Sequence, residues 1–426
     1  MANHRPINEY DVIICGAGPS GSTCAAFLSD KNLRVLLLDK AIFPREKTCG
    51  GALSDKAVAM LKKLGLENQV AKYSTLMDGL VLIAPNHTKA HLFPPINAKI
   101  TPGYTLRREI FDNLLFQNAK SKKNITTMEN VEVIDVFFNS KGKAIGIRAN
   151  TPKSEKTFLA KIIVGADGAN SIVARKIGAT NLDDRHWYVA ERQYWSGITS
   201  IRESIEFHFI DSVLPGYFWI FKLPNGEANV GLGTLVSDVK KRNLNLTKLF
   251  EKVITEDPII SPRFKNAKPL APLMGWRLPL ATIHRKNYHA GVLLIGDAAG
   301  LVDPSSGEGI SSAMVSGEIA AETISEAFRL GDYSAKMLSK YDKRLWGTIG
   351  AELSQSVFIQ KLFIQKKLLN WFLENAASDK LASEVFSDAF FVENTRHSNR
   401  NLLDFIHLIF PHQSIREKIT KARQGK

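Results

Sequence analysis

Cysteine is scarce in this chain. Cys15, Cys24 and Cys49 are the three cysteines among 426 residues, and their spacing matches neither a metal-binding motif nor a disulfide framework. A chain without a disulfide pattern is typical of a reducing compartment. We therefore predict a cytoplasmic protein that holds no metal.

Long apolar runs and a leader segment are also lacking. No uninterrupted apolar stretch approaches the roughly 18 residues that cross a bilayer. The first predicted strand begins within about ten residues of the start, which leaves no room for a signal peptide. These absences favour a protein that is soluble or that lies on a membrane surface.

The charge is unbalanced, with a formal net charge of +14. Such a charge attracts an acidic partner, such as a diphosphate, an anionic lipid surface or nucleic acid, and it fits a generally basic background equally well. Because no nucleic-acid-binding motif is present, we predict no nucleic-acid partner. The oligomeric state is left open.

The N-terminus carries a strand–turn–helix–strand pattern. Residues 10–15 (YDVIIC) are a short apolar run, as in a strand buried on both faces. The glycine-rich segment 16–21 (GAGPSG) follows, then a predicted helix over 22–29 and a second strand over 35–38 that ends at Asp39. In this context G-x-G-x-x-G predicts dinucleotide binding rather than a structural turn.

Each glycine of that motif has a physical role. Gly16 permits the tight turn, Gly18 lets the backbone approach a pyrophosphate, and Gly21 allows close packing of helix and strand. The phosphates are expected at the helix N-terminus, where free N–H groups favour negative charge. Asp39 is placed to accept hydrogen bonds from the adenosine ribose.

The remaining pattern divides into β-rich and helical stretches. We predict helices over 55–64 and 107–119, a small antiparallel meander over 131–138, 144–148 and 157–164 that leads into a core strand, and a buried strand over 292–295. A second antiparallel sheet is predicted over 204–209, 217–223 and 228–235, with 76–93 as a possible addition. From about residue 310 the pattern is helical.

Two later motifs identify the dinucleotide. Residues 163–175 (IVGADGANSIVAR) and 294–309 (LIGDAAGLVDPSSGEG) each begin with a buried strand that ends in glycine. They resemble the second and third fingerprints of the flavoprotein hydroxylase and geranylgeranyl reductase superfamily. The resemblance implies an α/β fold with FAD as cofactor. The expected fold has a Rossmann-like FAD-binding domain of the glutathione-reductase type, an antiparallel β-sheet substrate domain and a helical C-terminal region.

The domain boundaries follow from that plan. The FAD-binding domain is expected to be discontinuous, over 1–75, 100–185 and 275–330, with the substrate domain over 76–99 and 186–274 and the helical region over 331–426. Residues 43–54 (FPREKTCGGALS) resemble the Lys-x-Cys-Gly segment of the geranylgeranyl reductase family. Residues 215–221 (PGYFWIF) and 228–233 (ANVGLG) resemble that family's substrate-sheet motif, and the likeness covers roughly 8–330.

The resemblance assigns residues to the cofactor. Asp297 is implied to hold the ribityl or pyrophosphate end of FAD, and Asp167 to lie between FAD and the docking place of a pyridine nucleotide. The predicted cofactor site consists of Gly16, Gly18, Pro19, Ser20, Gly21, Asp39, Lys40, Cys49, Gly50, Arg107, Val131, Asp167, Gly168, Asp297, Gly309 and Ile310. In this set Val131 is implied to lie on the adenine side, and the helix that begins near Gly309 and Ile310 to direct its N-terminus at the flavin.

The predicted catalytic residues are Cys49, Gly50, Tyr217 and Trp219, and several have plainer interpretations. Cys49 alternatively serves as a small side chain beneath the flavin, and the two aromatic residues serve equally well as sheet core. Glu308 is either a proton donor or a solvated loop acid, and the second is favoured.

Arg107 also has two interpretations. It either contacts the cofactor, as the family match implies, or pairs with Glu109 or Asp112 on the surface of its own helix. The cofactor contact is the prediction.

The leading functional hypothesis is an FAD-dependent reductase of the geranylgeranyl reductase type. Reduced flavin would deliver hydride to carbon–carbon double bonds of an isoprenoid or other apolar small molecule, such as a polyprenyl diphosphate, lipid or quinone. NAD(P)H or reduced ferredoxin is the expected electron donor. The alternative is an FAD-dependent monooxygenase that hydroxylates an aromatic or polyketide substrate; a halogenase is disfavoured because Trp-x-Trp-x-Ile-Pro is absent, and a non-catalytic flavoprotein is the third hypothesis.

The C-terminal tail suggests peripheral contact with a membrane. Residues 402–410 are apolar around a helix, and Arg416, Lys418, Lys421 and Arg423 follow. Such a helix can lie in a membrane interface, although packing onto its own domain is the more frequent arrangement.

Overall fold

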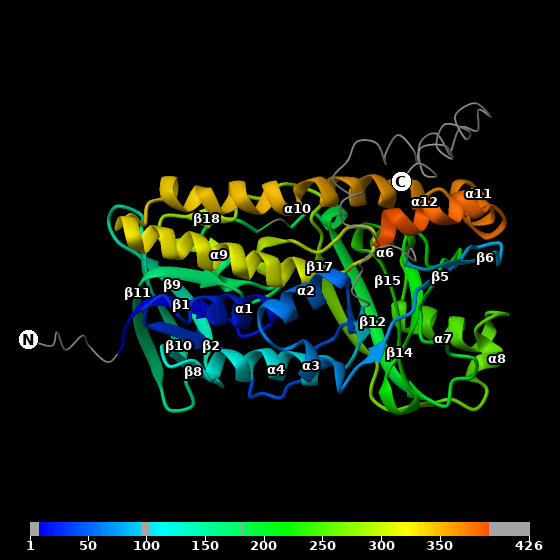
Figure 1. Cartoon of the computed structure of the whole chain (residues 1–426), viewed down its shortest axis with the longest axis horizontal. Coiled ribbons are helices and arrows are strands. Elements are labelled where there is room, and N and C mark those ends of the chain that lie inside the picture. Colours follow the sequence, from blue (N-terminus) through cyan, green and yellow to red (C-terminus); the bar gives the residue numbers. More distant parts are fainter. Residues whose placement is uncertain (1–7, 95–102, 181, 392–426) are drawn as a thin grey trace, which may run out of the picture.

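A mainly parallel β-sheet forms the core of the half that carries the N-terminus (Figure 1). The computed structural model describes residues 8–94, 103–180 and 182–391. The main strands run in the order β18 (Tyr288–His289), β19 (Val292–Leu294), β11 (Glu155–Gly165), β1 (Glu9–Cys15), β2 (Val35–Leu38) and β8 (Ile125–Met128). All neighbours are parallel except β18 and β19. The three predicted motifs therefore leave the sheet at one edge, where parallel strands end together.

Helices and a meander surround this sheet. Strands β1, β2 and β19 are apolar and almost wholly buried, because α1 (Pro19–Phe27), α9 (Ile310–Leu330) and neighbouring elements pack on the sheet. Strands β9 (Glu132–Phe138) and β10 (Ala144–Asn150) pair antiparallel with each other and with β11, as predicted. Strand β8, with the sequence ITTM, was not predicted because it is short and half polar.

The second sheet is mainly antiparallel and is buried on both faces. Its order is β16 (Lys268–Pro269), β12 (Trp187–Ser196), β15 (Glu227–Leu235), β14 (Tyr217–Lys222), β13 (Ile205–His208), β5 (Leu80–Ile83) and β6 (Lys89–Leu92), with β17 (Met274–Pro279) also on β12. The pair β5–β13 is parallel. Phe218 and Ile220 pack against α7 (Leu246–Glu256) and α8 (Ser261–Phe264), whereas Trp219 and Phe221 belong to a cluster on the other face.

The structure corrects the predicted elements of this region. Strands β12 and β17 and the helices α6 (Val236–Arg242), α7 and α8 were not predicted, whereas the addition of 76–93 to the sheet is confirmed. A third, small sheet of β3 (Ala52–Leu53), β7 (Tyr104–Thr105) and β4 (Thr75–Leu76) was also missed, because its strands have two residues each. It lies directly after the Lys-x-Cys-Gly-Gly segment, next to α2 (Asp55–Lys63), α3 (Glu67–Ala71) and α4 (Arg108–Lys120).

A helical layer joins the two halves of the molecule. Figure 1 shows α9 and α10 (Ala335–Phe363) along one side, with α10 continuing from the parallel sheet to the second sheet. Helices α11 (Lys366–Ser378) and α12 (Lys380–Phe391) pack on β6, which confirms a helical C-terminal region. The tail over 402–423, on which the hypothesis of membrane contact was based, lies outside the described residues.

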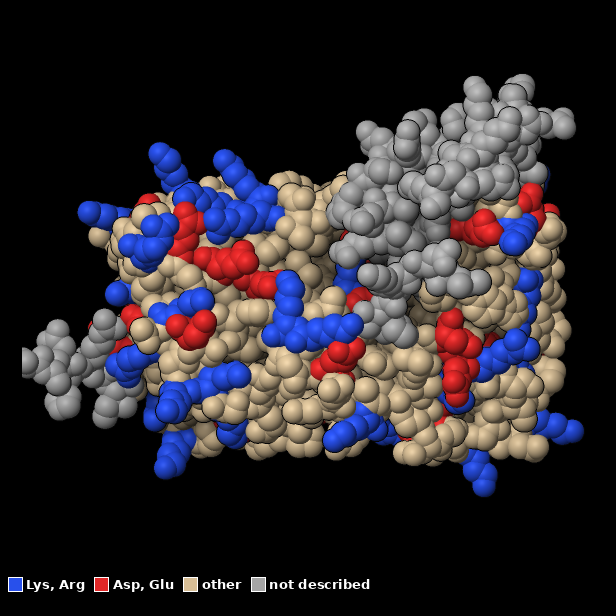
Figure 2. Space-filling model, in the orientation of Figure 1, with Lys and Arg blue, Asp and Glu red and all other residues tan. Residues whose placement is uncertain are grey.

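On the face shown in Figure 2, lysine and arginine side chains are interspersed with acidic ones. Several basic residues are paired, as where Glu326 binds both Lys340 and Arg344. Within the described residues, no helix is both long enough and apolar enough to span a bilayer.

A glycine sets the distance between the first motif and the helical layer. A Cβ on Gly317 of α9 would lie 2.6 Å from the carbonyl oxygen of Ser20 in α1. We expect Gly317→Ala to lower the free energy of unfolding by about 1–3 kcal/mol, because two backbones must separate. Urea unfolding of the purified protein measures this change.

Gly347 provides the matched control for that substitution. It lies exposed in α10, and a Cβ there would meet no atom within 4 Å. Gly347→Ala should therefore stabilise the protein by up to about 1 kcal/mol, because alanine favours the helix. Equal effects of the two substitutions would contradict the packing argument.

Candidate active site

The dinucleotide turn is closed on one side and open on the other. Gly16 has a φ of +107°, and a Cβ there would overlap the carbonyl oxygen of Ala166. A Cβ on Gly21 would overlap the carbonyl oxygen of Gly16. At Gly18 the nearest atom would instead be Nη2 of Arg45, at 3.7 Å. The open space at Gly18 fits a phosphate group at the N-terminus of α1, where Pro19 and Ser20 begin the helix.

Asp39 fixes this turn from the end of β2. Its Oδ2 accepts a hydrogen bond from the backbone N–H of Ala17 at 2.8 Å, and its Oδ1 accepts one from Ala41 at 2.9 Å. The buried Val131 donates its N–H to the carbonyl oxygen of Asp39 at 2.9 Å. Lys40 is exposed. Asp39 and Val131 are thus neighbours, as expected for two residues on the adenosine side of a bound nucleotide.

Asp167 of the second motif binds the N-terminus of helix α5 (Ile172–Lys176). Its carboxylate accepts hydrogen bonds from Oγ of Ser171 at 2.5 Å and from the N–H of Ile172 at 2.7 Å. Burial raises the pKa of Asp167, and these hydrogen bonds oppose that rise. Gly168 follows with a φ of +76° and open space where its Cβ would be. The bonds give Asp167 a structural role, while its predicted position beside the cofactor stays a prediction.

The third motif meets the first. After β19 the chain forms a short 3₁₀ turn over Gly296–Ala299, and a Cβ on Gly296 would lie 2.7 Å from Oγ of Ser20. Asp297 then lies beside the start of α9, because a Cβ on Gly309 would be 3.6 Å from its Oδ1. Gly309 precedes the first helical residue, Ile310, as predicted. These positions suit an Asp297 carboxylate that binds cofactor hydroxyls.

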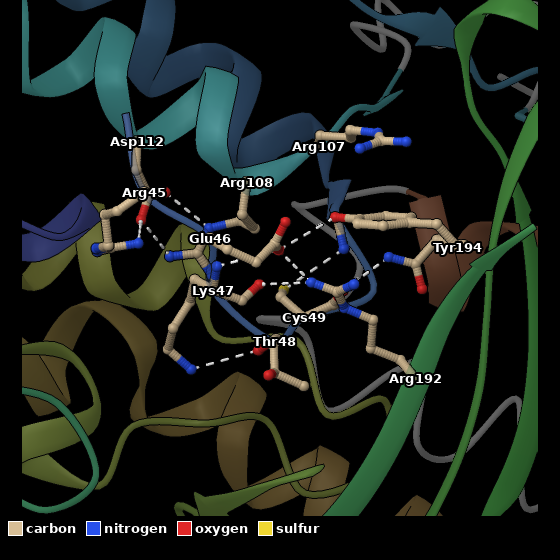
Figure 3. Close-up of polar contacts among 12 residues, drawn as sticks. Arg45, Glu46, Lys47, Thr48, Cys49, Arg107, Arg108, Asp112, Arg192 and Tyr194 are labelled. Carbon is tan, nitrogen blue, oxygen red and sulfur yellow. Dashed lines mark hydrogen bonds and ion pairs between the residues drawn. The ribbon is translucent and has the colours of Figure 1, made fainter. Parts of the chain in front are cut away.

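An arginine pair beside Gly18 was not predicted. Arg45 Nη1 lies 2.7 Å from the fully buried carboxylate of Asp112, and Arg108 binds the same carboxylate through two nitrogens at 2.7 and 2.8 Å (Figure 3). The two guanidiniums lower the pKa of Asp112 against the effect of burial. Two cations on one carboxylate leave a net positive charge, which suits a pyrophosphate. The only sequence signal was the position of Arg45 in the FPREKTCGG segment.

Arg107 pairs with a residue that the sequence did not suggest. Its Nη2 lies 2.7 Å from Glu227 of β15, and its guanidinium lies 4.3 Å from the centre of the Tyr194 ring. In Figure 3 it extends toward the second sheet, away from Asp112. The alternative pairing of Arg107 with Glu109 or Asp112 was wrong. Arg107 forms its ion pair with Glu227, and the neighbouring Arg108 forms the ion pair with Asp112. Contact between Arg107 and the cofactor stays a prediction.

Lys47 lies half-buried near the third motif. Its Nζ is 3.9 Å from the centre of the Trp276 ring. Burial lowers the pKa of Lys47 to about 8, and the charge of Asp297 opposes this shift. A second cation, Arg192, is buried and binds Glu46 and the carbonyl oxygen of Lys47. Basic groups therefore surround the Lys-x-Cys-Gly segment.

The predicted catalytic residues are connected through the second sheet. Asn229, which is 1% exposed, accepts a hydrogen bond from Trp219 Nε1 at 3.0 Å and donates one to the carbonyl oxygen of Cys49 at 2.7 Å. A Cβ on Gly50 would lie 2.8 Å from the ring of Phe221. The second sheet thus holds the backbone at Cys49 and Gly50 in place. The hydrogen bond that Asn229 makes to Cys49 was not predicted from the sequence.

Tyr217 reaches a different loop from the same strand. Its hydroxyl donates a hydrogen bond to the carbonyl oxygen of Ser306, which lies within the third motif. Tyr217 and Trp219 also line a cavity, so sheet core alone does not describe them.

That cavity, of about 300 Å³, lies between the two halves of the molecule. It is lined by residues 49–51 and 307–312, which include the predicted Cys49, Gly50, Gly309 and Ile310. Its apolar wall is formed by Met77, Leu80, Ile205, Phe207, Phe221 and Leu278. Charged residues also line it, namely Asp55, Lys56, Arg192, Asp303, Glu308 and Glu352. No cluster of metal ligands occurs among the residues that the structure describes.

The comparisons with known proteins agree with this geometry. Residues 9–203 match the family of the FAD binding domain. The digeranylgeranylglycerophospholipid reductase of Methanocaldococcus jannaschii is 31% identical over 350 residues, which cover 80% of this chain and 83% of that protein. The conditioned medium factor receptor 1 of Dictyostelium discoideum is 30% identical over 82% of this chain and 69% of its own length.

Solved structures show the same fold. A geranylgeranyl bacteriochlorophyll reductase-like protein from Thermoplasma acidophilum superposes with a TM-score of 0.80 and 23% identity, over 90% of this chain and 97% of that one. A flavin-dependent brominase superposes with a TM-score of 0.75 and 22% identity, over 98% and 100% of the two chains. The expected Rossmann-like FAD-binding fold with an antiparallel sheet is thereby confirmed.

Gly18 offers a test of the phosphate site that spares the fold. We expect Gly18→Ala to leave the melting temperature of the FAD-free protein almost unchanged, because the added Cβ meets no atom closer than 3.7 Å. FAD affinity should fall about tenfold or more, because the methyl group occupies the phosphate space. Fluorescence titration measures the affinity, and unchanged FAD binding would contradict the assignment.

Proposed function

Because this chain belongs to the geranylgeranyl reductase family of FAD-dependent oxidoreductases, we propose that it hydrogenates carbon–carbon double bonds of a polyprenyl substrate. The observation that carries the proposal is the cavity, whose apolar wall meets the Cys49–Gly51 and Gly307–Ser312 segments. An apolar wall of this kind suits an isoprenoid chain. FAD, when bound and reduced, supplies a hydride.

The chain's own residues would hold the cofactor and exclude water. Gly18, the N-terminus of α1 and Arg45 would receive the pyrophosphate, and Asp39 the adenosine ribose. Asp297 would receive the ribityl hydroxyls beside the start of α9. The position proposed for the pyrophosphate is supported by the open space at Gly18 and by the two guanidinium groups that share the single carboxylate of Asp112.

Four residues are proposed to act at the reacting end of the cavity. Gly50 leaves room for a ring against the backbone, and Cys49 lies beside it with its carbonyl oxygen held by Asn229. Tyr217 and Trp219 would press the polyprenyl chain toward this end, because both line the cavity and are fixed by hydrogen bonds. Side chains that are already held in place can orient a substrate without an additional loss of entropy during the reaction.

The electron donor is proposed to be NAD(P)H or reduced ferredoxin that meets the flavin transiently. The sequence contains one G-x-G-x-x-G motif, so a second dinucleotide would have no comparable turn to bind. A cytoplasmic location with peripheral contact to a membrane is part of the same proposal, since a polyprenyl lipid resides in the bilayer.

Monooxygenation and halogenation are less supported. The brominase and other neighbours share the fold at 22% identity or less, whereas reductases of digeranylgeranylglycerophospholipid reach 30–31% identity over most of this chain. The likeness to the halogenases is a likeness of fold alone.

An anaerobic single-turnover experiment tests the reductase. Dithionite-reduced protein is mixed without oxygen with geranylgeranyl diphosphate, a digeranylgeranyl phospholipid or a polyprenyl quinone. We expect reappearance of the oxidised flavin spectrum and a product that has gained two hydrogens for each bond reduced. A protein that stays reduced with all three substrates, yet forms a hydroxylated product in air, would be a monooxygenase.

A further inference from the structure

Glu308 occupies a special position in the cavity. It stands in the loop between Gly307 and Gly309, directly before α9, and lines the cavity with both neighbours. Its Oε1 accepts a hydrogen bond from the N–H of Ser311 at 2.8 Å, and its Oε2 accepts one from the Ser311 hydroxyl at 2.5 Å. Glu308 is thus a partly buried loop residue whose carboxyl is held at the first turn of α9.

The contacts of Glu308 distinguish it from Asp303 and Glu352, two other acids that line the cavity. Asp303 accepts hydrogen bonds from the backbone and hydroxyl groups of Ser305 and Ser306. Glu352 of α10 is paired with Lys56 of α2. Within the described residues, Glu308 has no cation at ion-pair distance.

Burial also raises the pKa of Glu308, and the charges of Asp303 and Glu352 raise it further, while the two bonds from Ser311 oppose the rise. A carboxyl group in this environment retains its proton to a higher pH than an exposed glutamate. Geometry and charge thus agree on a carboxyl group at the wall of the cavity that holds its proton more tightly than an exposed glutamate.

We propose that Glu308 is the general acid that completes the reduction. This inference rests on the proposed function. Saturation of a double bond requires one hydride and one proton, and the hydride with its electron pair comes from the reduced cofactor. As one carbon receives the hydride, the π electrons of the double bond form a C–H bond between the other carbon and the Glu308 proton. The O–H bond of Glu308 breaks, and its carboxylate regains a proton from water.

Other groups of the cavity serve this role less well. The Tyr217 hydroxyl donates a hydrogen bond to the carbonyl oxygen of Ser306. Burial raises the pKa of Tyr217, which makes this hydroxyl a weaker acid. Lys56 is engaged by Glu352. Arg192 is a guanidinium, which does not release a proton in the physiological range. Glu308 combines an acidic proton with access to the cavity.

The substitution Glu308→Gln tests the proposal directly. Its amide oxygen can still accept a hydrogen bond from Ser311, but the carboxylic proton is lost. We expect transfer from reduced cofactor to substrate to slow by about 10²–10⁴-fold in anaerobic single turnovers. FAD affinity and reduction of the flavin by dithionite should not change. Glu308→Asp, which retains an acid, should recover part of the rate.

Two measurements separate an acid from a merely structural residue. The wild-type rate of substrate reduction should fall as the pH rises through the pKa of Glu308, and Glu308→Gln should lack that fall. Infrared difference spectra of the FAD-loaded protein without substrate should show a carboxylic-acid carbonyl band that Glu308→Gln removes. Glu318→Gln is the matched control, because Glu318 lies on α9 and pairs with Lys63 outside the cavity wall.

The outcomes distinguish this inference from the function on which it rests. If wild-type protein reduces a polyprenyl substrate and Glu308→Gln does so at the same rate with the same pH profile, Glu308 is not the acid and the reductase remains. The absence of the carboxylic-acid band at a pH below the fall in rate would likewise overturn the inference. If wild-type protein reduces no such substrate, the proposed function fails and the inference fails with it.

Discussion

Close approach of backbones at small residues is the constraint on which the site depends. Gly21 lies against the carbonyl of Gly16, Gly296 lies against Ser20, and Gly317 brings α9 onto α1 at the same residue. Segments far apart in the chain therefore meet around the first turn of α1. The N-termini of α1 and α9 therefore lie close together, and both belong to the predicted cofactor site.

The second sheet completes the site through contacts with the FAD-binding half of the molecule. Asn229 joins Trp219 to the backbone of Cys49, Tyr217 binds the Ser306 carbonyl, and Arg107 pairs with Glu227. These three contacts cross between the halves of the molecule and border the space where the cavity forms. Because one face of the sheet already packs against α7 and α8, its other face is available to wall a substrate.

The two ends of the site differ in charge. Around Gly18 and the Lys-x-Cys-Gly segment, Arg45, Arg108 and Lys47 exceed the carboxylates that they contact. The cavity is lined by four acidic residues, Asp55, Asp303, Glu308 and Glu352, and by two basic ones, Lys56 and Arg192, of which Arg192 is bound by Glu46. The positive end suits phosphates. The acidic and apolar end suits an uncharged hydrocarbon chain and a proton donor.

The sequence by itself determined the nucleotide-binding unit, the order of its three motifs and most strands of both sheets, because apolar periodicity and motif spacing are local properties. Only the tertiary structure decided which side chains share the site. Asp112 with its two arginines, the partner of Arg107, the role of Asn229 and the position of Glu308 all depend on packing between elements distant in sequence. Sequence motifs and periodicity do not predict these contacts, because a glutamate has the same neighbours along the chain whether it faces solvent or a cavity.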